Sequence, residues 1–344
     1  RLKESEETFR ALTENSNDVI MRFNDKIEHI YVNPAAEKLL GISDVKLIGK
    51  GYKQLGFIGP VFINWEKAIE KVFLTGKENS IELLVDDGRW YDCRLYPEYD
   101  NEGKIVSVIT SSRDITELKK TERDLYKKEK LLRGVAEASN KLLALDSFYN
   151  RITTALEIIG KAAEVDRVYI FENRRDSETK ELYATQIYEW ADSDVLPQID
   201  NPLLKELKIQ NTGLEEAFNK LSAGLHWMRL TKDMPDLAKQ MSQEQGIKSL
   251  LVMPVEIGGT FWGFVGFDEC KYERIWDEGE IAILKILASD VGGAFTRKLI
   301  EDALMNTEER FKALFDYAPI SYFIVDPEGD FIDANNSLEK TFGY

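Results

Sequence analysis

Short apolar runs separated by polar turns fill the first part of the chain and predict a mixture of short strands and helices. Val19 to Phe23 and Ile27 to Val32 flank the polar stretch 24–26, which is a hairpin signal. Asn33 then precedes Pro34, so its side chain can cap a short helix that begins at the proline. The pattern therefore predicts a β-hairpin followed by a helix.

Helical spacing and turn residues predict the other elements of this region. Leu2 to Glu14 forms a charged amphipathic pattern, and a second helical pattern ends at Gly76. The apolar positions of that second pattern are Trp65, Ile69, Val72 and Phe73. Three strands follow, divided by turns at 86–88 and 100–103 that contain Asp and Gly. Two strands, several helices and three antiparallel strands predict an α+β domain.

A strongly charged helical pattern begins at Leu118 and continues to about residue 145. Apolar positions recur every seven residues at Leu118, Leu125 and Leu132, and again at Val135 and Leu142. Such a row is the seam of a coiled coil, although Thr121 and Lys128 interrupt its second line. We expect this helix either to pair with a second chain or to pack on its own domain.

Residues 146–288 combine a helix, several apolar strands and a closing helix. Asp146 is the expected N-cap of the first helix, whose apolar face holds Phe148, Ile152, Leu156 and Ile159. Strands are expected at "VDRVYIFE" and at about 182–190. The stretch "SLLVMPVEIGGTFWGFVGFDEC" predicts a hairpin that turns at Gly258-Gly259, with strands apolar on both faces. Asp277 and Glu280 have the spacing of a capping box before the last helix, in which Gly292-Gly293 is an expected close-packing point.

An internal repeat organises the whole chain. Residues 7–41 match residues 309–343 without a gap, at a shift of 302. The identical pairs are Glu7/Glu309, Phe9/Phe311, Ala11/Ala313, Leu12/Leu314, Ile30/Ile332, Asn33/Asn335, Glu37/Glu339, Lys38/Lys340 and Gly41/Gly343. A period this long indicates two copies of one domain type around a different domain, rather than a solenoid.

Three stretches of the first copy resemble PAS domains of sensor kinases. They are "VNPAAEKLLG", "RWYDCRLYPEYDNEGKIVSVITSSRDIT" and the exit "ELKKTERDL". The ending Asp114-Ile115-Thr116, between the last strand and a helix, is the most specific of these motifs. The resemblance covers residues 1–118 and again 307–344, and it implies a five-stranded antiparallel sheet that cups a small pocket.

The hairpin "MPVEIGGTFWGFVGFD" and the helix after it resemble a GAF domain, over most of residues 140–296. The resulting domain prediction is PAS over 1–117, a linker helix over 118–145, GAF over 146–288, a linker helix over 289–306, and the beginning of a second PAS domain over 307–344. The resemblance places the variable wall of the ligand pocket at 192–235. Aromatic side chains that could line this pocket are Trp190, Trp227, Phe261, Trp262, Phe264 and Trp276.

Charge and composition narrow the function classes. The net charge of the 344 residues is −16, and no long basic run is present, which excludes nucleic acid and anionic membrane surfaces as expected partners. Apolar runs such as Leu250–Met253 are far shorter than the roughly 20 residues of a spanning helix. The two isolated cysteines favour a reducing, cytoplasmic setting. We interpret the chain as a piece of a longer protein, so a membrane tether could lie outside it.

Catalytic chemistry has little support in the sequence. His29 and His226 lack the surroundings of a phosphoacceptor, and no Gly-rich nucleotide loop is found. Two distant histidines do not make a metal hydrolase, so we expect neither a catalytic nor a metal site. The absence of an axial histidine between residues 44 and 76 predicts no haem in the PAS domain.

The sequence predicts different roles for the two cysteines. Cys93, on a predicted strand, is expected to be a small half-buried residue. Cys270, at the exit of a GAF strand, is the candidate cofactor-binding residue, for haem or another small ligand, with Arg274 able to lower its pKa. The alternative is a capping cysteine without a cofactor, and GAF domains often carry "GFD-x-C" at this place.

Asp114, Ile115 and Thr116 are the candidate signal relay, because in PAS domains this motif ties the last strand to the outgoing helix. Three hypotheses follow for function. The first is the sensory input region of a sensor histidine kinase, a homodimer with a downstream kinase domain, a response regulator and an unknown small-molecule ligand. The second is thiol chemistry at Cys270, and the third is a ligand-free dimerisation scaffold. A diguanylate cyclase or phosphodiesterase is the alternative parent.

Overall fold

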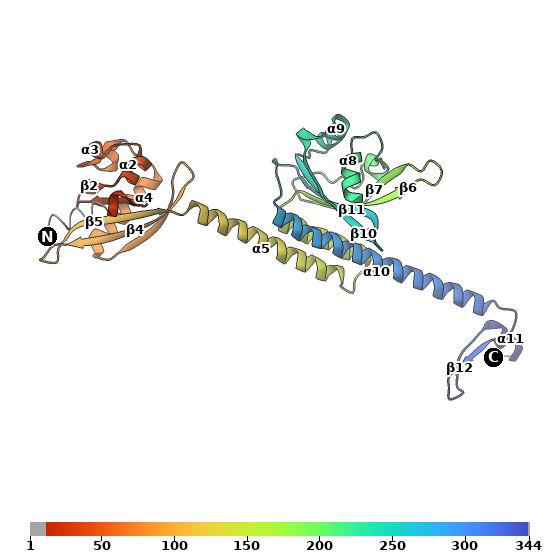
Figure 1. Cartoon of the computed structure of the whole chain (residues 1–344). Helices are drawn as coiled ribbons and strands as arrows, with labels where there is room; N and C mark the ends of the chain where they lie inside the picture. The colour runs from red at the N-terminus through yellow and green to blue at the C-terminus, as the bar shows by residue number, and fades with distance from the viewer. Residues whose placement is uncertain (1–11, 343–344) are drawn as a thin grey trace. The chain divides into compact units, whose positions relative to one another are not determined.

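The computed structural model describes residues 12–342 and divides the chain into two compact units, residues 1–126 and 127–344 (Figure 1). Both units combine helices with antiparallel sheets, so the predicted α+β class is confirmed. Most of the expected helix from Leu2 to Glu14 lies outside the described residues, and within them residues 12–14 are helical. The repeat pairs that involve Glu7, Phe9, Ala11 and Gly343 also lie outside them.

The first unit is built on a five-stranded antiparallel sheet with the strand order β2-β1-β5-β4-β3. The strands are β1 Val19–Phe23, β2 His29–Val32, β3 Asn79–Leu84, β4 Trp90–Tyr99 and β5 Ile105–Asp114. Between β2 and β3 run α2 Pro34–Leu40, α3 Asp44–Leu47, the 3₁₀ turn η1 Tyr52–Leu55 and α4 Pro60–Thr75. The first and last strands of the domain pair in its centre, so β5 leaves the middle of the sheet and leads into the next helix.

Local sequence explains the helices of this unit. The Asn33 side chain accepts the backbone N–H of Ala36 and so caps α2, as predicted. Helix α4 ends at Gly76, whose left-handed backbone lets the chain turn without a Cβ clash. Trp65, Ile69 and Val72 of α4 are buried against the sheet in one core. The residues at the predicted helical spacing therefore form the face of α4 that packs on the sheet.

The second unit carries a six-stranded antiparallel sheet with the order β8-β7-β6-β11-β10-β9. Its strands are β6 Arg167–Arg175, β7 Leu182–Ala191, β8 Leu207–Lys208, β9 Trp227–Leu230, β10 Ser249–Ile257 and β11 Thr260–Glu269. The helices are α6 Phe148–Ala163, α7 Pro202–Lys205, α8 Glu215–Ser222, η2 Thr231–Asp233, α9 Asp236–Glu244 and α10 Glu278–Asp316. The predicted hairpin joins β10 to β11 through Gly258 and Gly259, both of which have positive φ.

The sheet of the second unit is buried on both faces, which explains its unbroken apolar strands. In β10, Leu251, Met253 and Val255 belong to the core on one face, while Leu250 and Val252 belong to the core on the other. Helices α6 and α10 pack on the first face. The second face is covered by the region that contains α7, α8 and α9. Successive side chains alternate between these two cores, as the period of a strand requires.

Helix α5, Thr116–Leu142, begins in the first unit and ends in the second. The predicted linker is helical, but Leu131, Val135, Ala138 and Leu142 are buried in the core of the second unit. In that unit Lys128 pairs with Asp277 at the start of α10, and Ser139 donates a hydrogen bond to Asp290. The second half of α5 therefore packs on its own domain, which was one of the two alternatives for this helix.

Two local predictions at helix starts had different outcomes. Asp277 and Glu280 form the predicted capping box of α10, with the Asp277 side chain accepting the N–H groups of Gly279 and Glu280. The N-cap of α6 is Ser147, not Asp146. Asp146 lies one position too early and instead accepts the backbone N–H of Ser147 and the side-chain amide of Asn150.

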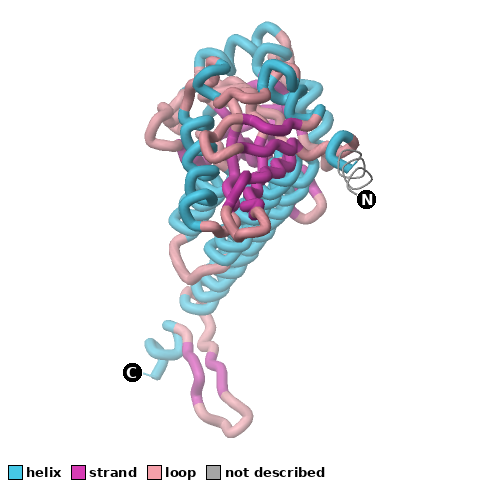
Figure 2. Tube along the Cα trace, turned by 90° about the vertical axis from the view of Figure 1, so that its left-hand side faces the viewer, coloured by secondary structure: helices cyan, strands magenta, loops and turns pink. Residues whose placement is uncertain are grey.

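Helix α10 continues well beyond its last core residue, Phe295, toward the end of the described chain (Figure 2). It leads into β12 Phe323–Val325, β13 Phe331–Ala334 and α11 Asn336–Phe342. No helix within residues 12–342 has the length and apolar content that crossing a bilayer requires.

The final hairpin repeats the first one in atomic detail. In the first copy, Asn33 accepts the N–H of Ile20 and donates to the carbonyl of Asp18. In the second copy, Asn335 accepts the N–H of Tyr322 and donates to the carbonyl of Ile320. The two sets of partners differ by the same shift of 302 that relates the sequences, so the repeat is structural.

Candidate functional site

A cavity of about 110 Å³ lies in the second unit, on the side of the sheet covered by α7 to α9. Strands β6, β9, β10 and β11 supply one wall, and residues of the segment 204–247 supply most of the rest. The lining residues are Tyr169, Phe171, Leu204, Leu207, Ile209, Leu214, Ala217, Phe218, Leu221, Trp227, Met234, Ala238, Met241, Ser242, Gln245, Ile247, Leu250, Val252 and Phe264. None of these side chains is a carboxylate, an amine, a guanidinium or an imidazole.

The cavity wall is aromatic on the sheet side. Phe171 and Phe264 stack with their ring centroids 4.9 Å apart. Two of the six aromatic residues expected to line the pocket, Trp227 and Phe264, do so. The other four, Trp190, Phe261, Trp262 and Trp276, pack elsewhere in the hydrophobic cores. Strand phase explains Trp190 and Trp262, which pack on the opposite core, because neighbouring residues of one strand face opposite sides of the sheet. Phe261 packs on the same core as the cavity, beside Phe218, and Trp276 precedes α10.

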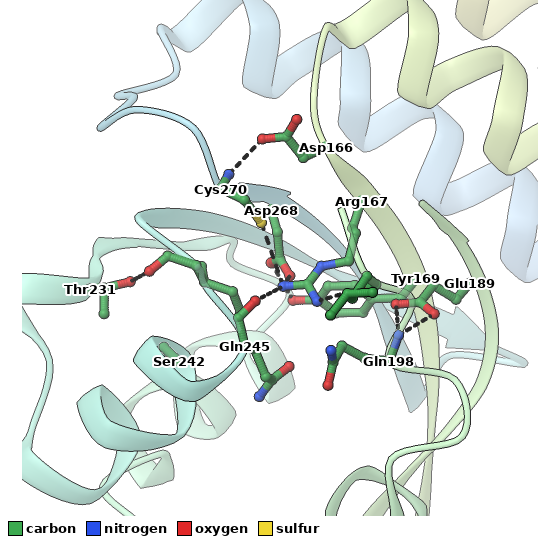
Figure 3. Close-up of polar contacts among 12 residues, drawn as sticks. Asp166, Arg167, Tyr169, Glu189, Gln198, Thr231, Ser242, Gln245, Asp268 and Cys270 are labelled. Carbon is green, nitrogen blue, oxygen red and sulfur yellow. Dashed lines mark hydrogen bonds and ion pairs between the residues drawn. The ribbon is translucent and has the colours of Figure 1, made fainter. Parts of the chain in front are cut away.

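Beside the cavity lies a buried network centred on Arg167 (Figure 3). The side chains of Arg167 and Asp268 are each 1% exposed, and their Nη2 and Oδ2 atoms are 3.3 Å apart. Arg167 Nη2 also donates to the backbone carbonyl of Gln245 at 3.0 Å. Tyr169, a cavity residue, donates its hydroxyl to Asp268 Oδ1 at 3.0 Å. Two residues of the cavity wall, Tyr169 and Gln245, are thus attached to one buried ion pair.

Burial controls the ionisation of this network. Desolvation raises the pKa of Asp268 to about 6, against the opposing effect of Arg167 and the Tyr169 hydroxyl. Desolvation also raises the pKa of Tyr169 well above its ordinary value, with the charge of Asp268 acting in the same direction. The tyrosine therefore remains a neutral donor, and Asp268 is a carboxylate at neutral pH because Arg167 faces it.

Cys270 sits at the edge of this network. Arg167 Nη2 lies 3.6 Å from its Sγ atom, and burial raises the pKa of the thiol to about 11 despite the guanidinium. Arg274 was expected to lower this pKa, and that expectation is wrong. Arg274 instead donates to the carbonyls of Ala163 and Glu164 and pairs with Glu280 at 2.7 Å. Cys270 is not among the described residues that line the cavity, and its role as a cofactor ligand stays a prediction.

A buried pair of acidic side chains, Asp166 and Glu269, flanks the Cys270 thiol. Asp166 Oδ2 accepts the backbone N–H of Cys270 at 2.7 Å, and its Oδ1 lies 3.0 Å from Lys271 Nζ. Burial opposes ionisation of Asp166, but hydrogen bonds from Glu269 and Cys270 and the neighbouring Lys271 hold its pKa below the ordinary value. Burial and the facing Asp166 raise the pKa of Glu269 to about 7. The proton of the pair therefore resides on Glu269.

This pair predicts a pH dependence of stability. From about pH 4.5 to 7 the folded chain keeps a proton on Glu269 that the unfolded chain releases. The free energy of unfolding should therefore fall as the pH rises through this window. Urea unfolding at several pH values should show this slope, and Glu269→Gln should reduce it to the part that Asp268 contributes below about pH 6. The exposed Glu273→Gln, which changes a surface ion pair with Lys232, is the matched control and should leave the slope intact.

The first unit has a cavity of its own, of about 290 Å³. It is lined by Val19, Met21, Leu39, Leu40, Tyr52, Phe57, Val61, Phe62, Trp65, Leu83, Val85, Asp86, Asp87, Tyr91, Cys93 and Ser112. Cys93 is 2% exposed, and burial raises the pKa of its thiol to about 11. This cysteine is therefore more fully buried than expected, and it is not a thiolate at neutral pH.

The predicted relay residues meet at the junction between β5 and α5. Asp114 Oδ1 accepts the backbone N–H of Thr116 at 2.9 Å and also its hydroxyl. Thr116 Oγ1 in turn accepts the backbone N–H of Trp90, and Ile115 donates its N–H to the Trp90 carbonyl at 2.8 Å. The start of α5 is thus tied to the first residue of β4, the strand next to β5.

A charged contact extends the same junction to a third strand. Lys119, in the first turn of α5, pairs with Glu82 of β3 at 2.8 Å. Its ammonium group also lies 5.7 Å from the centre of the Trp90 ring. The side chain of Lys119 is 29% exposed, so this ion pair is weaker than a buried one. Strands β3, β4 and β5 therefore all contact the beginning of α5.

The two histidines do not form a site. His29 is fully buried in β2, where burial lowers its pKa and its Nδ1 lies 2.6 Å from the carbonyl oxygen of Lys50. His226 is an exposed residue before β9. Among residues 12–342, no group of three or more His, Cys, Asp and Glu side chains is placed to hold a metal ion.

The Arg167 network was missed by reasoning from the sequence. Its signal was present in "DRVYIFE", where Arg167 has the same strand phase as Tyr169 and Phe171 and so points to the same buried face. The sequence does not indicate that Asp268 is the partner of Arg167, because the two residues lie opposite each other only through the register of β6 and β11.

Three domain families match the chain. The PAS fold matches residues 13–120, the GAF domain matches residues 150–295, and the PAS domain matches residues 309–344. The predicted PAS–GAF–PAS order is confirmed, while the predicted limits between domains and linkers stay predictions.

Two histidine kinases are similar in sequence. The methanogenesis regulatory histidine kinase FilI of Methanothrix harundinacea is 31% identical over 306 residues, which are 86% of this chain and 33% of FilI. The signal transduction histidine-protein kinase AtoS of Escherichia coli is 26% identical over 162 residues, which are 43% of this chain and 25% of AtoS. The chain thus spans a third or less of the length of these relatives.

Solved structures of chromophore-binding proteins align more loosely. The chromophore-binding domain of Stigmatella aurantiaca bacteriophytochrome is 14% identical with a TM-score of 0.39, covering 81% of this chain and 94% of that one. The phycocyanobilin-bound GAF domain of a cyanobacterial phytochrome is 17% identical with a TM-score of 0.40, covering 51% and 96%. At such TM-scores the chromophores of those proteins imply nothing for this chain.

Proposed function

Because this chain consists of PAS and GAF domains and its curated relatives are sensor histidine kinases, we propose that it is the sensory input region of such a kinase. In this proposal, a small molecule in one of the two cavities shifts the population of two conformations of its domain. Helices α5 and α10 carry that shift toward a kinase domain of the same protein, whose phosphoryl group passes to a response regulator. The phosphotransfer itself belongs to the part of the protein outside this chain.

The junction of β5 and α5 is the observation that carries the proposal. Asp114 and Thr116 connect the first turn of α5 to the backbone of Trp90, and Lys119 adds a contact to Glu82. Movement of the sheet around the 290 Å³ cavity would therefore change the direction in which α5 leaves it. The presence of a cavity in each domain favours ligand sensing over a ligand-free scaffold.

Dimerisation of the input region fits the exposed row on α5. Leu118, Leu125 and Leu132 recur every seven residues, and each is more than half exposed. The buried residues Leu131 and Val135 occupy a different side of the helix, so packing on the second unit leaves this row free for a second copy of α5. A parallel pair of such helices would pass a rotation of one domain to the next.

Replacement of Asp114 by alanine tests the proposal in the full-length protein. The substitution removes the acceptor for the Thr116 backbone N–H and hydroxyl, which frees the Thr116 side chain that holds the N–H of Trp90 and so loosens the start of α5 on the sheet. A lost cap of this kind is worth roughly 0.5–2 kcal/mol. If the junction sets the two-state balance, the rate of autophosphorylation should therefore change by roughly 2- to 30-fold.

The matched control is Asp100→Ala. Asp100 accepts the N–H groups of Glu102 and Lys104 in the turn between β4 and β5, so this variant also loses an Asp-capped turn. It should leave autophosphorylation within about twofold of the unchanged protein, since the turn has no contact with α5 in this proposal. Equal rates for the Asp114 variant, the control and the unchanged protein would refute the relay.

A further inference from the structure

We propose that the cavity of the first unit binds a hydrophobic organic cation, whose apolar body fills the buried end of the cavity and whose positive group lies among aromatic rings at the open end, near Asp86. The inference rests on the proposed sensory function and names the class of ligand that this cavity takes. Three properties of the cavity carry it, which are its change from buried to exposed lining, its cluster of rings and the charge of its lining.

The cavity has a buried end and an open end. Trp65 and Cys93 in its lining are 4% and 2% exposed, whereas Phe57 and Phe62 are half-buried and Asp86 is exposed. Its volume of about 290 Å³ exceeds the roughly 150 Å³ of an engineered apolar cavity that binds benzene. A ligand larger than benzene can therefore bury an apolar body here and keep a charged group at the end that is open to water.

Three aromatic rings of the lining pack on one another. The ring centroids of Tyr52 and Phe62 are 5.2 Å apart, those of Phe57 and Phe62 are 4.9 Å apart, and those of Tyr52 and Phe57 are 6.0 Å apart. Aromatic rings attract cations that lie within about 6 Å of their centroids. An ammonium group whose charge is spread over several alkyl groups suits such a place, because it is weakly hydrated and costs less to remove from water than a primary ammonium.

The charge of the lining favours a cation over an anion. Two carboxylates, Asp86 and Asp87, and no Lys, Arg or His side chain are found among the described residues that line the cavity. Asp87 pairs with Arg89 at 2.5 Å, and this guanidinium also lies 5.7 Å from the centre of the Tyr91 ring. Asp86 has no ion pair or side-chain hydrogen bond within residues 12–342. An unpaired carboxylate beside the rings attracts a positive ligand group and repels carboxylates and phosphates.

Three probes of similar size separate charge from shape. Phenyltrimethylammonium and tert-butylbenzene differ only in the replacement of nitrogen by carbon, so the hydrocarbon is the uncharged match of the cation, and benzenesulfonate carries a negative group on the same ring. Titrations of the whole chain followed in ¹H–¹⁵N spectra give the dissociation constants, and the amides that shift show where each probe binds. We expect phenyltrimethylammonium to bind the first unit at least about 10-fold more tightly than benzenesulfonate.

Two variants test the open end of the cavity. Asp86→Asn removes the unpaired carboxylate and should weaken binding of the ammonium by about 2- to 5-fold at low salt, with hydrocarbon binding unchanged. Phe62→Leu removes one ring but keeps an apolar side chain, so it should weaken binding of the ammonium by about 2- to 30-fold and of the hydrocarbon by a smaller factor. The control is Asp25→Asn, which removes the same charge from an exposed residue outside the cavity lining and should leave all three affinities unchanged.

Four results would overturn the assignment. They are no binding of the ammonium to the first unit, binding of the sulfonate as tight as that of the ammonium, equal losses for ammonium and hydrocarbon in Phe62→Leu, and equal effects of Asp86→Asn and Asp25→Asn. The probes on the unchanged chain and the Asp86→Asn variant decide the question even if Phe62→Leu does not fold. The Asp114→Ala result in the full-length kinase is independent of these probes, so failure of the ligand class and failure of the sensory function are distinguishable.

Discussion

Replacing Arg167 by alanine is expected to lower the free energy of unfolding of the second unit by about 3–5 kcal/mol, because it leaves a buried carboxylate unpaired. Arg167 and Asp268 are both 1% exposed, so water cannot take over the role of the guanidinium. The same change deprives the Gln245 carbonyl of its donor. The loss should shrink as the pH falls, because Asp268, whose pKa is about 6 even beside Arg167, takes up a proton more readily once the guanidinium is gone.

Hydrogen exchange of the whole chain measures this effect by region. The most protected amides of β6 and β11 should exchange faster in Arg167→Ala, whereas those of β1 and β5 in the first unit serve as an internal reference. The control is Arg174→Ala, which removes an exposed pair with Glu206 and should cost less than about 0.5 kcal/mol. A loss as small as that of the control would show that the buried ion pair does not stabilise the sheet.

A double variant separates the ion pair from the fold. Arg167→Met with Asp268→Asn removes both charges while keeping an acceptor for the Tyr169 hydroxyl. Replacement of a buried pair by uncharged groups of similar volume is often nearly neutral, so the double variant should be more stable than Arg167→Ala alone. An equal or larger loss in the double variant would mean that the hydrogen bonds donated by Arg167, such as the one to the Gln245 carbonyl, rather than its charge, hold the site together.

Alanine at the two adjacent glycines of α10 should have effects of opposite sign. A Cβ at Gly292 would lie 2.5 Å from the backbone oxygen of Glu256, so Gly292→Ala must push α10 away from β10. Overpacking of this kind costs about 1–3 kcal/mol. At Gly293 the nearest atom is the end of the Arg297 side chain at 3.6 Å. Gly293→Ala should therefore stabilise the helix by about 0.5–1 kcal/mol, the difference in helix propensity.

Calorimetry of the whole chain should resolve the two variants. For a domain of this size, 1 kcal/mol shifts the melting temperature by about 2–4 °C. Gly292→Ala should therefore lower the transition of the second unit by about 2–12 °C, and Gly293→Ala should raise it by about 1–4 °C. Two decreases of similar size would contradict the close approach of Gly292 and indicate that both glycines are needed for backbone flexibility.

Elements and turns followed from local sequence to a large extent. Asn33 before Pro34, the left-handed Gly76 and the Gly258-Gly259 hairpin are dictated by side chains or backbone within a few residues. The repeat at a shift of 302 was readable for the same reason, since equivalent residues such as Asn33 and Asn335 make equivalent local bonds. Where a neighbouring residue could serve the same role, the local signal misled, as with Asp146 and Ser147.

The candidate site was less predictable, because it depends on strand register. The sequence indicates Cys270 as a candidate cofactor-binding residue. It also indicates Arg274 as the side chain that lowers the pKa of this thiol, because the two residues are close in sequence. In the folded chain Arg167, more than one hundred residues away, faces the thiol instead. The attachment of Gln245 to Arg167 likewise arises from a contact between distant segments.

The sequence by itself determined the order of domains, the α+β class and the strand-to-helix junction at Asp114, because patterning, caps and turns act over short distances. Only the tertiary structure decided that half of α5 belongs to the second core, that Arg167 pairs with Asp268, and that a small uncharged cavity lies beside them. The physical reason is that each of these features depends on which face of a strand or helix meets which distant partner. Periodicity shows that a face is buried, whereas register and packing decide what lies against it.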